Sequence, residues 1–546
     1  MYYATTAKLA FQGNQLMMKT LTRIKNKLFI DPITKRYIEL NKNRYPQNFP
    51  VDFGSVVLVD LYDDYLSTHL YAKVINLLAK KHRARIEAFY FPRTSLGKLG
   101  GNFRRRLYSV YKSFGVKGML SYDGSKAYIP AARAYAKQTV AALKTKDDVV
   151  EIRLEGIKIG DLIYQSYLRN QRETLNLDEC KHDLELLLID AYCIFKNSED
   201  YFKKNSVRAV LISHTMFIHY GIMLRFASSR NIPAYRIVNL GWRKSEGTAL
   251  MRVDPTHNFS AWPYWTYKTE FAKLPSAAQE QARKEGESYL SAWLSGESTK
   301  IGGMSILKGK NSWTKPVKPT PVFEKNSKTK CLILMNSFYD GPHYFRAMLF
   351  PDLWEWMMFT LTEASKTDFD WYFKPHPMSI QKNFEVNEQI KKMFPKVRFI
   401  PKDTSNYQIV DEGVNAIFSV FGSSLHEYPH FDVPAVSAGE SFPLNYDFYI
   451  KPKSREEYVW MIHNADKLKV ENKEQMGEFA YMHYSYFLRK NRERARPFPD
   501  TIEDFFMNDC GASAVTPKIL DFIMKHESEE RNKKLDCYLE EFFSEN

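Results

Sequence analysis

Three short segments of the sequence decide the fold, and each is a run of apolar residues that ends in polar ones. They read CLILMNSFYDGPH (331–343), FDWYFKPHP (369–377) and AIFSVFGSSLHE (416–427). Apolar runs of this length are typical of strands buried inside a parallel sheet. Because ligands of an open parallel sheet bind beyond the carboxyl ends of its strands, we expect the three polar segments to converge on one crevice.

Signals for strands and helices alternate on both sides of these segments. In the second half of the chain we expect strands at 331–335, 369–373, 397–400, 415–420 and 433–437, and helices at 350–366, 383–394, 405–411 and 424–430. In the first half we expect strands at 55–60, 85–90, 209–212 and 234–238, and helices at 66–80, 184–203 and 219–229. A strand, helix, strand order predicts parallel pairing, because parallel strands need a long crossover.

The division into domains follows from this alternation. Residues 299–330 combine Gly, Pro and Lys with little periodicity, which predicts a linker, and from about Arg455 the pattern is helical. We therefore expect an α/β fold with two doubly wound, Rossmann-like parallel-sheet domains and a helical C-terminal tail. The expected units are a basic arm (1–45), an N-terminal domain (46–300), the linker (301–330), a C-terminal domain (331–480) and C-terminal helices that pack back on the N-terminal domain (481–546).

Composition limits the class of protein. A chain of 546 residues is too long for one core, and 44% hydrophobic with 15% aromatic residues is ordinary for a globular protein. No apolar run approaches the ~18 residues that a membrane span requires, so we expect a soluble protein. The five cysteines are scattered and never spaced as CxxC, which argues against a zinc site or a disulfide framework and favours a reducing cytoplasm.

The charge of the chain points to an anionic partner without choosing one. The formal net charge is +15, and the first 45 residues hold nine Lys or Arg against Asp31 and Glu39. Leu21, Ile24 and Leu28 share one face of a potential helix in this arm. The arm therefore suits either an anionic membrane surface or a solvated basic extension.

A glycine- and arginine-rich segment, 95–117, lies in the first half. We expect a solvated surface loop there, with the binding of an anionic acceptor as the alternative. The segment contains neither the GxGxxG nor the GxxxxGK pattern of a phosphate-binding loop. The sequence also shows no RNA- or DNA-binding motif, so we expect no nucleic-acid partner.

Two of the three polar segments suit a phosphate. Gly422, Ser423 and Ser424 follow a strand and open a helix, so their backbone N–H groups and hydroxyls would point into the crevice. A plain serine N-cap is the alternative. Lys374 and His376 stand beside two prolines that restrict the backbone, and both side chains can bind a phosphate. A lone histidine is more often structural, but its place at a strand end favours a function.

The remaining segment adds a carboxylate. Asp340 precedes Gly341 and Pro342, a turn that would project it from the strand end. It could act as a base, as a nucleophile on an anomeric carbon, or as an ordinary turn residue. The acidic pair Asp63 and Asp64 falls in the other domain, and no DxD-type pair stands near the crevice, so we expect no metal site.

Four segments of the second half resemble bacterial capsule polysaccharide biosynthesis proteins, namely NSFYDGPH (336–343), LFPDLWEW (349–356), KPHP (374–377) and GSSLHEY (422–428). Within that group they are similar to GT-B transferases that use CMP-activated ulosonic acids, chiefly the retaining β-Kdo transferases. The His-Pro and Ser-Ser pairs also resemble bacterial sialyltransferases. The likeness covers about residues 325–460 and is thinner in the first half, where GIKIGDLIY (156–164) and SHT (213–215) carry it.

The resemblance implies a nucleotide site and a nucleophile. The CMP phosphate would be held by a set of basic and hydroxyl-bearing residues with one glycine, namely Lys374, His376, Gly422, Ser423 and Ser424. Glu427 would accept hydrogen bonds from the ribose. Asp340 would match the carboxylate proposed as nucleophile in the retaining enzymes, with His376 also counted among the catalytic residues.

The resemblance places the acceptor in the N-terminal domain. Glu155, Asp161 and His214 are then the candidates for activating the acceptor hydroxyl. A surface strand residue is the alternative for Glu155, and a helix N-cap is the alternative for Asp161.

The implied protein is a GT-B glycosyltransferase that moves CMP-linked Kdo, or a nonulosonic acid of sialic or pseudaminic type, onto a capsule or lipopolysaccharide glycan, with retention through an Asp340 adduct. The donor carries one phosphate, whose departing charge protein groups can stabilise without a metal, and no cofactor is expected beside it. Expected partners are the nucleotide sugar, a glycan or lipid-linked glycan, and an anionic membrane surface at the inner face of the cytoplasmic membrane. Three alternatives stay open: a CDP-glycerol glycerophosphotransferase of teichoic-acid type, a UDP- or GDP-sugar transferase, and a non-enzymatic polysaccharide-assembly binding protein.

Overall fold

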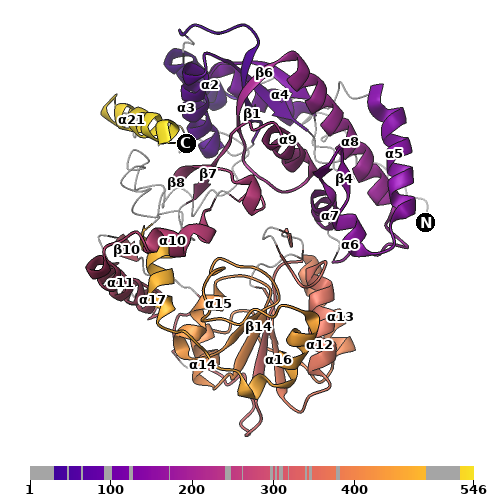
Figure 1. Ribbon diagram of the computed structural model, residues 1–546, viewed down its shortest axis with the longest axis vertical. Coiled ribbons are helices and arrows are strands. Elements are labelled where there is room, and N and C mark those ends of the chain that lie inside the picture. The colour runs from indigo at the N-terminus through magenta and orange to yellow at the C-terminus, as the bar shows by residue number, and fades with distance from the viewer. Residues whose placement is uncertain are drawn as a thin grey trace, which may run out of the picture.

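The structure is a computed structural model that describes most of the chain. The described residues are 30–45, 48–62, 65–91, 101–121, 127–170, 173–239, 248–260, 262–295, 299–301, 304–306, 312–317, 319–338, 341–343, 347–376, 381–486, 520 and 529–545. The fold is α/β, as the sequence predicts, with one large sheet in each half of the chain (Figure 1).

The N-terminal sheet has six strands in the order β3-β2-β1-β6-β7-β8. They are β1 (Ser55–Asp60), β2 (Arg85–Tyr90), β3 (Val116–Ser121), β6 (Ser206–Leu211), β7 (Ala234–Asn239) and β8 (Thr248–Arg252). Neighbouring strands are parallel except β7 and β8, so the expectation of an all-parallel sheet is wrong at this edge. The connection from residue 239 to residue 248 is shorter than a parallel crossover requires, which explains the antiparallel pairing.

Helices cover both faces of this sheet. They are α2 (Pro32–Arg44), α3 (Tyr65–Lys81), α4 (Gly101–Ser113), α5 (Ile129–Ala142), α6 (Lys146–Val150), α7 (Gly160–Leu168), α8 (Lys181–Lys204) and α9 (Ile218–Ser228). Alternate residues of a strand point to opposite faces. Val57 and Val59 of β1 therefore join the core under α2, α3 and α4, whereas Val56 and Leu58 join the core under α7, α8 and α9.

Within the segment 95–117, where we expected a surface loop, residues 101–113 form a helix. Helix α4 begins at Gly101 and ends at Ser113, and residues 92–100 lie outside the described residues. Leu107, Val110, Tyr111 and Phe114 are buried in the core, and their spacing of three or four residues puts them on one helical face. This periodicity outweighs the glycines and arginines from which a loop was inferred.

The C-terminal sheet has five parallel strands in the order β13-β12-β11-β14-β15. They are β11 (Lys330–Leu334), β12 (Asp370–Lys374), β13 (Arg398–Phe399), β14 (Ala416–Ser419) and β15 (Ala435–Ser437). The helices around them are α12 (Leu353–Ala364), α13 (Gln381–Met393), α14 (Asn406–Asp411), α15 (Ser424–Glu427) and α16 (Arg455–His463). The strand order reverses its direction between β11 and β14, which is the switch point where open sheets bind ligands.

The expected linker is partly packed into the C-terminal half. Its first part carries a short hairpin of β9 (Thr299–Ile301) and β10 (Met304–Ile306). Trp313 is fully buried, with its ring 5.2 Å from that of Tyr428, and Phe323 lies 4.2 Å from the ring of Tyr372. These aromatic side chains were missed as core residues because they stand among lysines and prolines without a helical or strand period.

Chain segments far apart in sequence cross beside the C-terminal sheet. Helix α11 (Ser276–Ser295) packs on α17 (Gln475–Ala480), which continues into a π-helical turn, Tyr481–Tyr486, while α10 (Tyr267–Phe271) lies nearby (Figure 1). A Cβ atom added to Gly286 would lie 2.0 Å from the carbonyl oxygen of Gly477. Glycine is therefore needed where the two backbones cross.

The last described helix returns to the N-terminal sheet. Helix α21 (Glu529–Glu545) packs against α3 (Figure 1). Leu539, Phe542 and Phe543 are buried in the same core as α3, and the Phe543 ring lies 5.2 Å from that of Tyr235. None of the helices in the described ranges combines the length and the apolar character that crossing a membrane would require.

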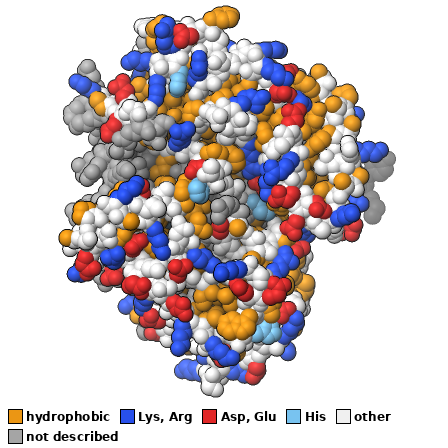
Figure 2. All heavy atoms as spheres, viewed as in Figure 1, with side chains coloured by type: hydrophobic (Ala, Val, Ile, Leu, Met, Phe, Trp, Pro, Cys, Tyr) orange, Lys and Arg blue, Asp and Glu red, His pale blue; other side chains and the backbone are white. Residues whose placement is uncertain are grey.

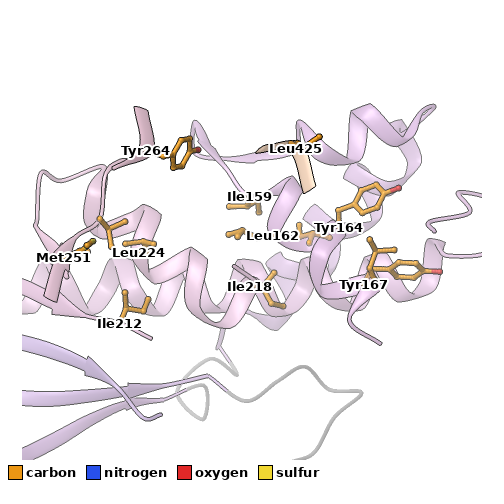
Figure 3. Close-up of a cluster of buried hydrophobic side chains, with 14 of the residues drawn as sticks. Ile159, Leu162, Tyr164, Tyr167, Ile212, Ile218, Leu224, Met251, Tyr264 and Leu425 are labelled. Carbon is orange, nitrogen blue, oxygen red and sulfur yellow. The ribbon is translucent and has the colours of Figure 1, made fainter. Parts of the chain in front are cut away.

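A continuous hydrophobic cluster joins the two halves. It contains residues of α7, α8 and α9 together with Leu332, Tyr372 and Leu425 of the C-terminal half. Figure 3 shows Leu425 beside the side chains of the N-terminal half. The relative position of the two sheets therefore rests on apolar packing as well as on polar contacts.

A buried carboxylate is the main polar contact between the halves. Asp352 is 0% exposed and caps α12, because its Oδ1 accepts a hydrogen bond from the backbone N–H of Glu355 at 2.7 Å. Its Oδ2 accepts from the hydroxyls of Tyr164 at 2.6 Å and Thr174 at 2.5 Å, both in the N-terminal half. Lys146 lies 3.5 Å from the same oxygen and 2.7 Å from Glu355. One side chain therefore fixes the start of α12 against α7.

We expect Asp352→Ala to destabilise the protein by about 2–4 kcal/mol, because it removes a helix cap and leaves the buried Tyr164 hydroxyl and the partly buried Thr174 hydroxyl without this acceptor. Asp352→Asn, which keeps an acceptor oxygen, should cost less. Urea unfolding followed by tryptophan fluorescence measures the difference. Asp368→Ala removes an exposed carboxylate paired with Lys328 and is the matched control, expected to change stability by less than about 1 kcal/mol. Equal unfolding midpoints for Asp352→Ala and Asp368→Ala would contradict the role of Asp352.

Candidate functional site

The first and third polar segments meet at one edge of the C-terminal sheet. Strands β11, β12 and β14 are parallel neighbours, so their carboxyl ends lie side by side. Asn336, just beyond β11, donates from Nδ2 to the Phe421 carbonyl at 3.0 Å and accepts from the Ser419 hydroxyl at 3.2 Å. These bonds tie the two segments together. Asp340 lies outside the described residues, as does Tyr339.

Lys374 brings a buried cation to this edge. It is the last residue of β12, is 7% exposed, and donates from Nζ to Oδ1 of Asn406 at 2.5 Å. Burial lowers the pKa of Lys374 to about 8, and the Glu427 carboxylate opposes this shift. His376 follows two residues later and is half-buried. An ammonium group with so little solvent around it interacts strongly with any anion that reaches it.

Glu427 lies in a network of protein donors. It is buried, and Trp293 donates from Nε1 to its Oε1 at 3.4 Å. Burial raises the pKa of Glu427, whereas hydrogen bonds from Ser423 and Trp293 and the charge of Lys374 oppose the rise. The carboxylate thus connects the second polar segment to the third, and its expected role toward a ribose stays a prediction.

Gly422, Ser423 and Ser424 form the turn that follows β14. Gly422 has φ +126°, which favours glycine, and its N–H donates to the Ser441 hydroxyl at 3.2 Å. Among the described residues, no acceptor lies within hydrogen-bond reach of the N–H groups of Ser423 and Ser424. Two adjacent N–H groups of this kind can bind an anion.

The helix after this turn is shorter than the expected 424–430. Helix α15 ends at Glu427, and a 3₁₀ turn over Pro429–Phe431 follows it. Pro429 has no N–H to continue the hydrogen-bond ladder. A helix of one turn has almost no macrodipole, so the N–H groups themselves, rather than a helix dipole, are available to an anion.

His214 stands where the N-terminal half meets the loop after β11. It follows β6, and its Nδ1 lies 2.9 Å from the hydroxyl of Ser213, whose backbone N–H donates to Oδ2 of Asp60 at 2.9 Å. Two residues later, the Met216 sulfur lies 2.5 Å from the position of a Cβ atom built on Gly341. The structure therefore brings the 213–216 loop and the 336–343 segment together across the two halves.

Asp161 forms a buried ion pair. Its carboxylate accepts two hydrogen bonds from the guanidinium of Arg225, at 2.6 and 2.5 Å. Burial alone would raise the pKa of Asp161, but the Arg225 charge outweighs it, so the pKa is lowered. Asp161 is in the first turn of α7, where Ile159 holds the N-cap position. A carboxylate committed to a bidentate partner is a weak base, and its catalytic assignment stays a prediction.

Glu155 lies at the tip of a small hairpin formed by β4 (Arg153–Leu154) and β5 (Ile157–Lys158). Its φ is +49°, its side chain is about half exposed, and it pairs with Lys196 of α8. These are the surroundings of a surface turn residue. A catalytic role for Glu155 is a prediction that these contacts do not support.

A cavity of about 660 Å³ opens between the two halves. Its wall combines polar and apolar residues from α6, α7, α9, the 255–259 turn and the 343–351 loop, including Asp161, Arg225, Lys158, Phe259, His343 and Phe350. Glu155 is not part of the wall. Within the described ranges, no group of three or more His, Cys, Asp or Glu side chains is placed to hold a metal ion.

Two residues of these sites were not predicted from the sequence. Asp60 ends the apolar strand 55–60 just as Lys374 ends β12, so the rule that selects polar residues at strand ends would have found it. Asp352 carries no such signal. It is a helix cap by sequence, and its contacts with Tyr164 and Thr174 exist only in the folded chain.

No protein-family model matches the sequence, and a search of curated proteins finds no match. Nine chains among the solved structures are similar, including the following three. The Thermosulfurimonas dismutans KpsC β-Kdo 2,7 transferase aligns at 11% identity over 53% of this chain and 80% of its own, with a TM-score of 0.31. The KpsC β-Kdo 2,4 transferase of the same organism aligns at 15% identity over 53% and 87%, also with a TM-score of 0.31. A Neisseria meningitidis UDP-GlcNAc 2-epimerase bound to UDP-GlcNAc aligns at 11% identity over 80% and 99%, with a TM-score of 0.21. At this level of similarity they assign no function to the chain.

Proposed function

We propose that this protein is a glycosyltransferase that transfers a CMP-activated ulosonic acid, Kdo or a nonulosonic acid of sialic or pseudaminic type, to a capsule or lipopolysaccharide glycan. One observation carries the proposal. Lys374 and the backbone N–H groups of Ser423 and Ser424 stand at the ends of β12 and β14, on either side of β11 and beside the switch point of the sheet. This is where an open parallel sheet binds a nucleotide.

The donor groups suit a single phosphate. The charge that develops when CMP departs can be stabilised by four kinds of group. They are two backbone N–H groups, the hydroxyls of Ser423 and Ser424, the Lys374 ammonium and the His376 imidazole. The proposal therefore includes transfer without a metal or a cofactor. Glu427 beside Lys374 reduces the net charge of the site, which favours a monophosphate over a more highly charged diphosphate.

In the proposed reaction Asp340 is the nucleophile. A carboxylate oxygen of Asp340 forms a bond to the anomeric carbon while the bond from that carbon to the phosphate oxygen breaks, and the electron pair leaves with CMP. The acceptor oxygen then replaces the carboxylate and loses its proton to a base, so the configuration is retained. The described flanks of Asp340 support this assignment, because Phe338 is buried and Gly341 lies against the loop after β6.

The acceptor of the proposed enzyme is a glycan or a lipid-linked glycan. The N-terminal half would bind it, at the inner face of the cytoplasmic membrane, with the basic arm on anionic lipids. Residues 1–29 of that arm lie outside the described residues. Figure 2 shows Lys and Arg side chains interspersed with Asp and Glu over both halves of one face, so membrane attachment is assigned to the arm rather than to this face.

A thermal-shift series tests the nucleotide. We expect CMP to raise the melting temperature, because a ligand that binds the native state stabilises it, with cytidine and the UDP and GDP controls giving smaller shifts. A response to CDP-glycerol and its transfer to an acceptor would instead identify a glycerophosphotransferase. A shift with UDP or GDP that requires a divalent metal would identify a different nucleotide-sugar transferase. No response to any nucleotide would favour a non-enzymatic binding protein.

Variants of the catalytic candidates separate binding from chemistry. We expect Asp340→Ala to abolish transfer while CMP still binds, because the nucleophile contributes only to bond formation. His376→Ala should weaken CMP binding by about tenfold or more, since it removes a charge-assisted donor. Isothermal titration with CMP and turnover with a CMP-ulosonic acid measure the two effects. His463→Ala on α16, far along the chain from these segments, is the control. Near-normal turnover of Asp340→Ala would exclude it as nucleophile.

CMP affinity should also depend on pH through Lys374. The pKa of this ammonium is about 8, so it is charged at pH 7 and mostly neutral at pH 9, and CMP should bind more weakly as pH rises through 8. The phosphate itself stays a dianion over this range, since its second pKa is near 6. Lys374→Met should bind CMP weakly at both pH values. An affinity of the unmodified protein that is the same at pH 7 and pH 9 would contradict a role for Lys374.

A further inference from the structure

Asp60, Ser213 and His214 form a chain of hydrogen bonds at the carboxyl edge of the N-terminal sheet. Asp60 ends β1 and Ser213 follows β6, the next strand in the sheet. Both the backbone N–H and the hydroxyl of Ser213 donate to Oδ2 of Asp60, and Nδ1 of His214 lies 2.9 Å from the same hydroxyl oxygen. The Asp60 carboxylate is thus linked to the His214 imidazole through the Ser213 hydroxyl.

The proton count along this chain selects one histidine tautomer. A serine hydroxyl has a single proton, and that of Ser213 is donated to Asp60. The Ser213 hydroxyl oxygen can therefore only accept a hydrogen bond from His214. The imidazole proton is then on Nδ1. In a neutral imidazole with the proton on Nδ1, Nε2 carries the lone pair and is the basic nitrogen.

Asp60 titrates near neutral pH and is mostly an anion only above about pH 7. Asp60 is 1% exposed, and burial raises its pKa to about 7, whereas the hydrogen bonds from Ser213 and the charge of Arg236 oppose the rise. The guanidinium of Arg236 also donates from Nε to the Ser213 carbonyl at 2.7 Å. Among the described residues, the phenols of Tyr71 and Tyr111 also interact with Asp60, and burial raises the pKa of both, so they stay neutral.

His214 is positioned beside the proposed transfer site. Its ring lies between Tyr62, at 5.4 Å with the ring edge toward it, and Tyr220, at 5.1 Å in a stacked arrangement. The loop that carries it touches Gly341, the residue after Asp340, through Met216. The imidazole is half-buried.

We propose that Asp60 and Ser213 are positioning residues that hold His214 with its proton on Nδ1, and that Nε2 of His214 is the base that takes the proton of the acceptor hydroxyl. The assignment rests on the proposed function. In this step, the acceptor oxygen forms its bond to the anomeric carbon while the bond from that carbon to the Asp340 carboxylate oxygen breaks. The electron pair of the broken bond stays on the carboxylate, and the acceptor proton moves to Nε2. The imidazolium so formed is stabilised by the Asp60 carboxylate through the Ser213 hydroxyl.

The tautomer itself can be measured without turnover. In protein with ¹⁵N-labelled histidine, the nitrogen shifts of His214, assigned by its loss in His214→Ala, should report a proton on Nδ1. Asp60→Ala should free the Ser213 hydroxyl to donate to Nδ1, so that the imidazole proton moves to Nε2. His463, which pairs with Glu363 at the surface, should be unchanged and is the internal reference.

Turnover and its pH profile separate positioning from mere structure. We expect His214→Ala, Asp60→Asn and Ser213→Ala each to lower turnover by about 100-fold or more with CMP affinity unchanged. Ser213→Thr keeps the hydroxyl and should retain most of the activity. The acid limb of the pH profile should move to lower pH in Ser213→Ala, because the imidazolium loses its link to the carboxylate. His463→Gln should keep normal turnover, and melting temperatures exclude unfolded variants.

Two results would overturn the proposal. One is a proton on Nε2 of His214 in the unmodified protein, and the other is near-normal turnover of folded Asp60→Asn or Ser213→Ala. If the unmodified protein neither binds CMP nor transfers a sugar, the proposed function is wrong. The nitrogen shifts would still decide separately whether Asp60 and Ser213 hold His214 in the stated tautomer.

Discussion

The buried carboxylate of Asp352 is the contact on which the geometry of the crevice depends most. It accepts hydrogen bonds from the start of α12 and from Tyr164 and Thr174 of the other half, in surroundings that exclude water. A buried carboxylate is stable only where its oxygens accept hydrogen bonds. Because the donors to Asp352 come from both halves, this aspartate keeps the halves in one relative position. The apolar cluster that contains Leu425 reinforces that position.

With the halves held in this way, the two sheets direct their strand ends toward a common region. The C-terminal sheet supplies Lys374 and the N–H groups of Ser423 and Ser424, and the N-terminal sheet supplies the chain from Asp60 to His214. In both sheets the polar groups follow buried parallel strands, where burial shifts the pKa values of the carboxyl and ammonium groups toward neutrality. Groups with such pKa values can exchange protons and bind anions near pH 7.

Sequence patterns predicted most strands and helices, and the errors have physical causes. The segment 95–117 was taken for a loop because its glycines and arginines are conspicuous, yet the spacing of Leu107, Val110, Tyr111 and Phe114 makes it a helix. Trp313 lies in a segment without periodicity and is nevertheless fully buried. For the site, the strand-end rule selected Lys374 and Ser423 but overlooked Asp60, and His214 was selected only through the family resemblance. Nothing local distinguishes Glu155 at a surface turn from a residue in the crevice.

The sequence by itself determined the α/β class, the positions of the buried strands and the polar residues that follow them, because these depend on local periodicity and on the chemistry of single residues. The tertiary structure alone decided which strand ends become neighbours, which carboxylate joins the halves, and that Asp161 is bound by Arg225 while His214 is linked to Asp60. Those outcomes depend on contacts between residues up to 206 positions apart, as between Lys146 and Asp352. Their free energies arise from burial and pairing in the folded chain, which no local pattern encodes.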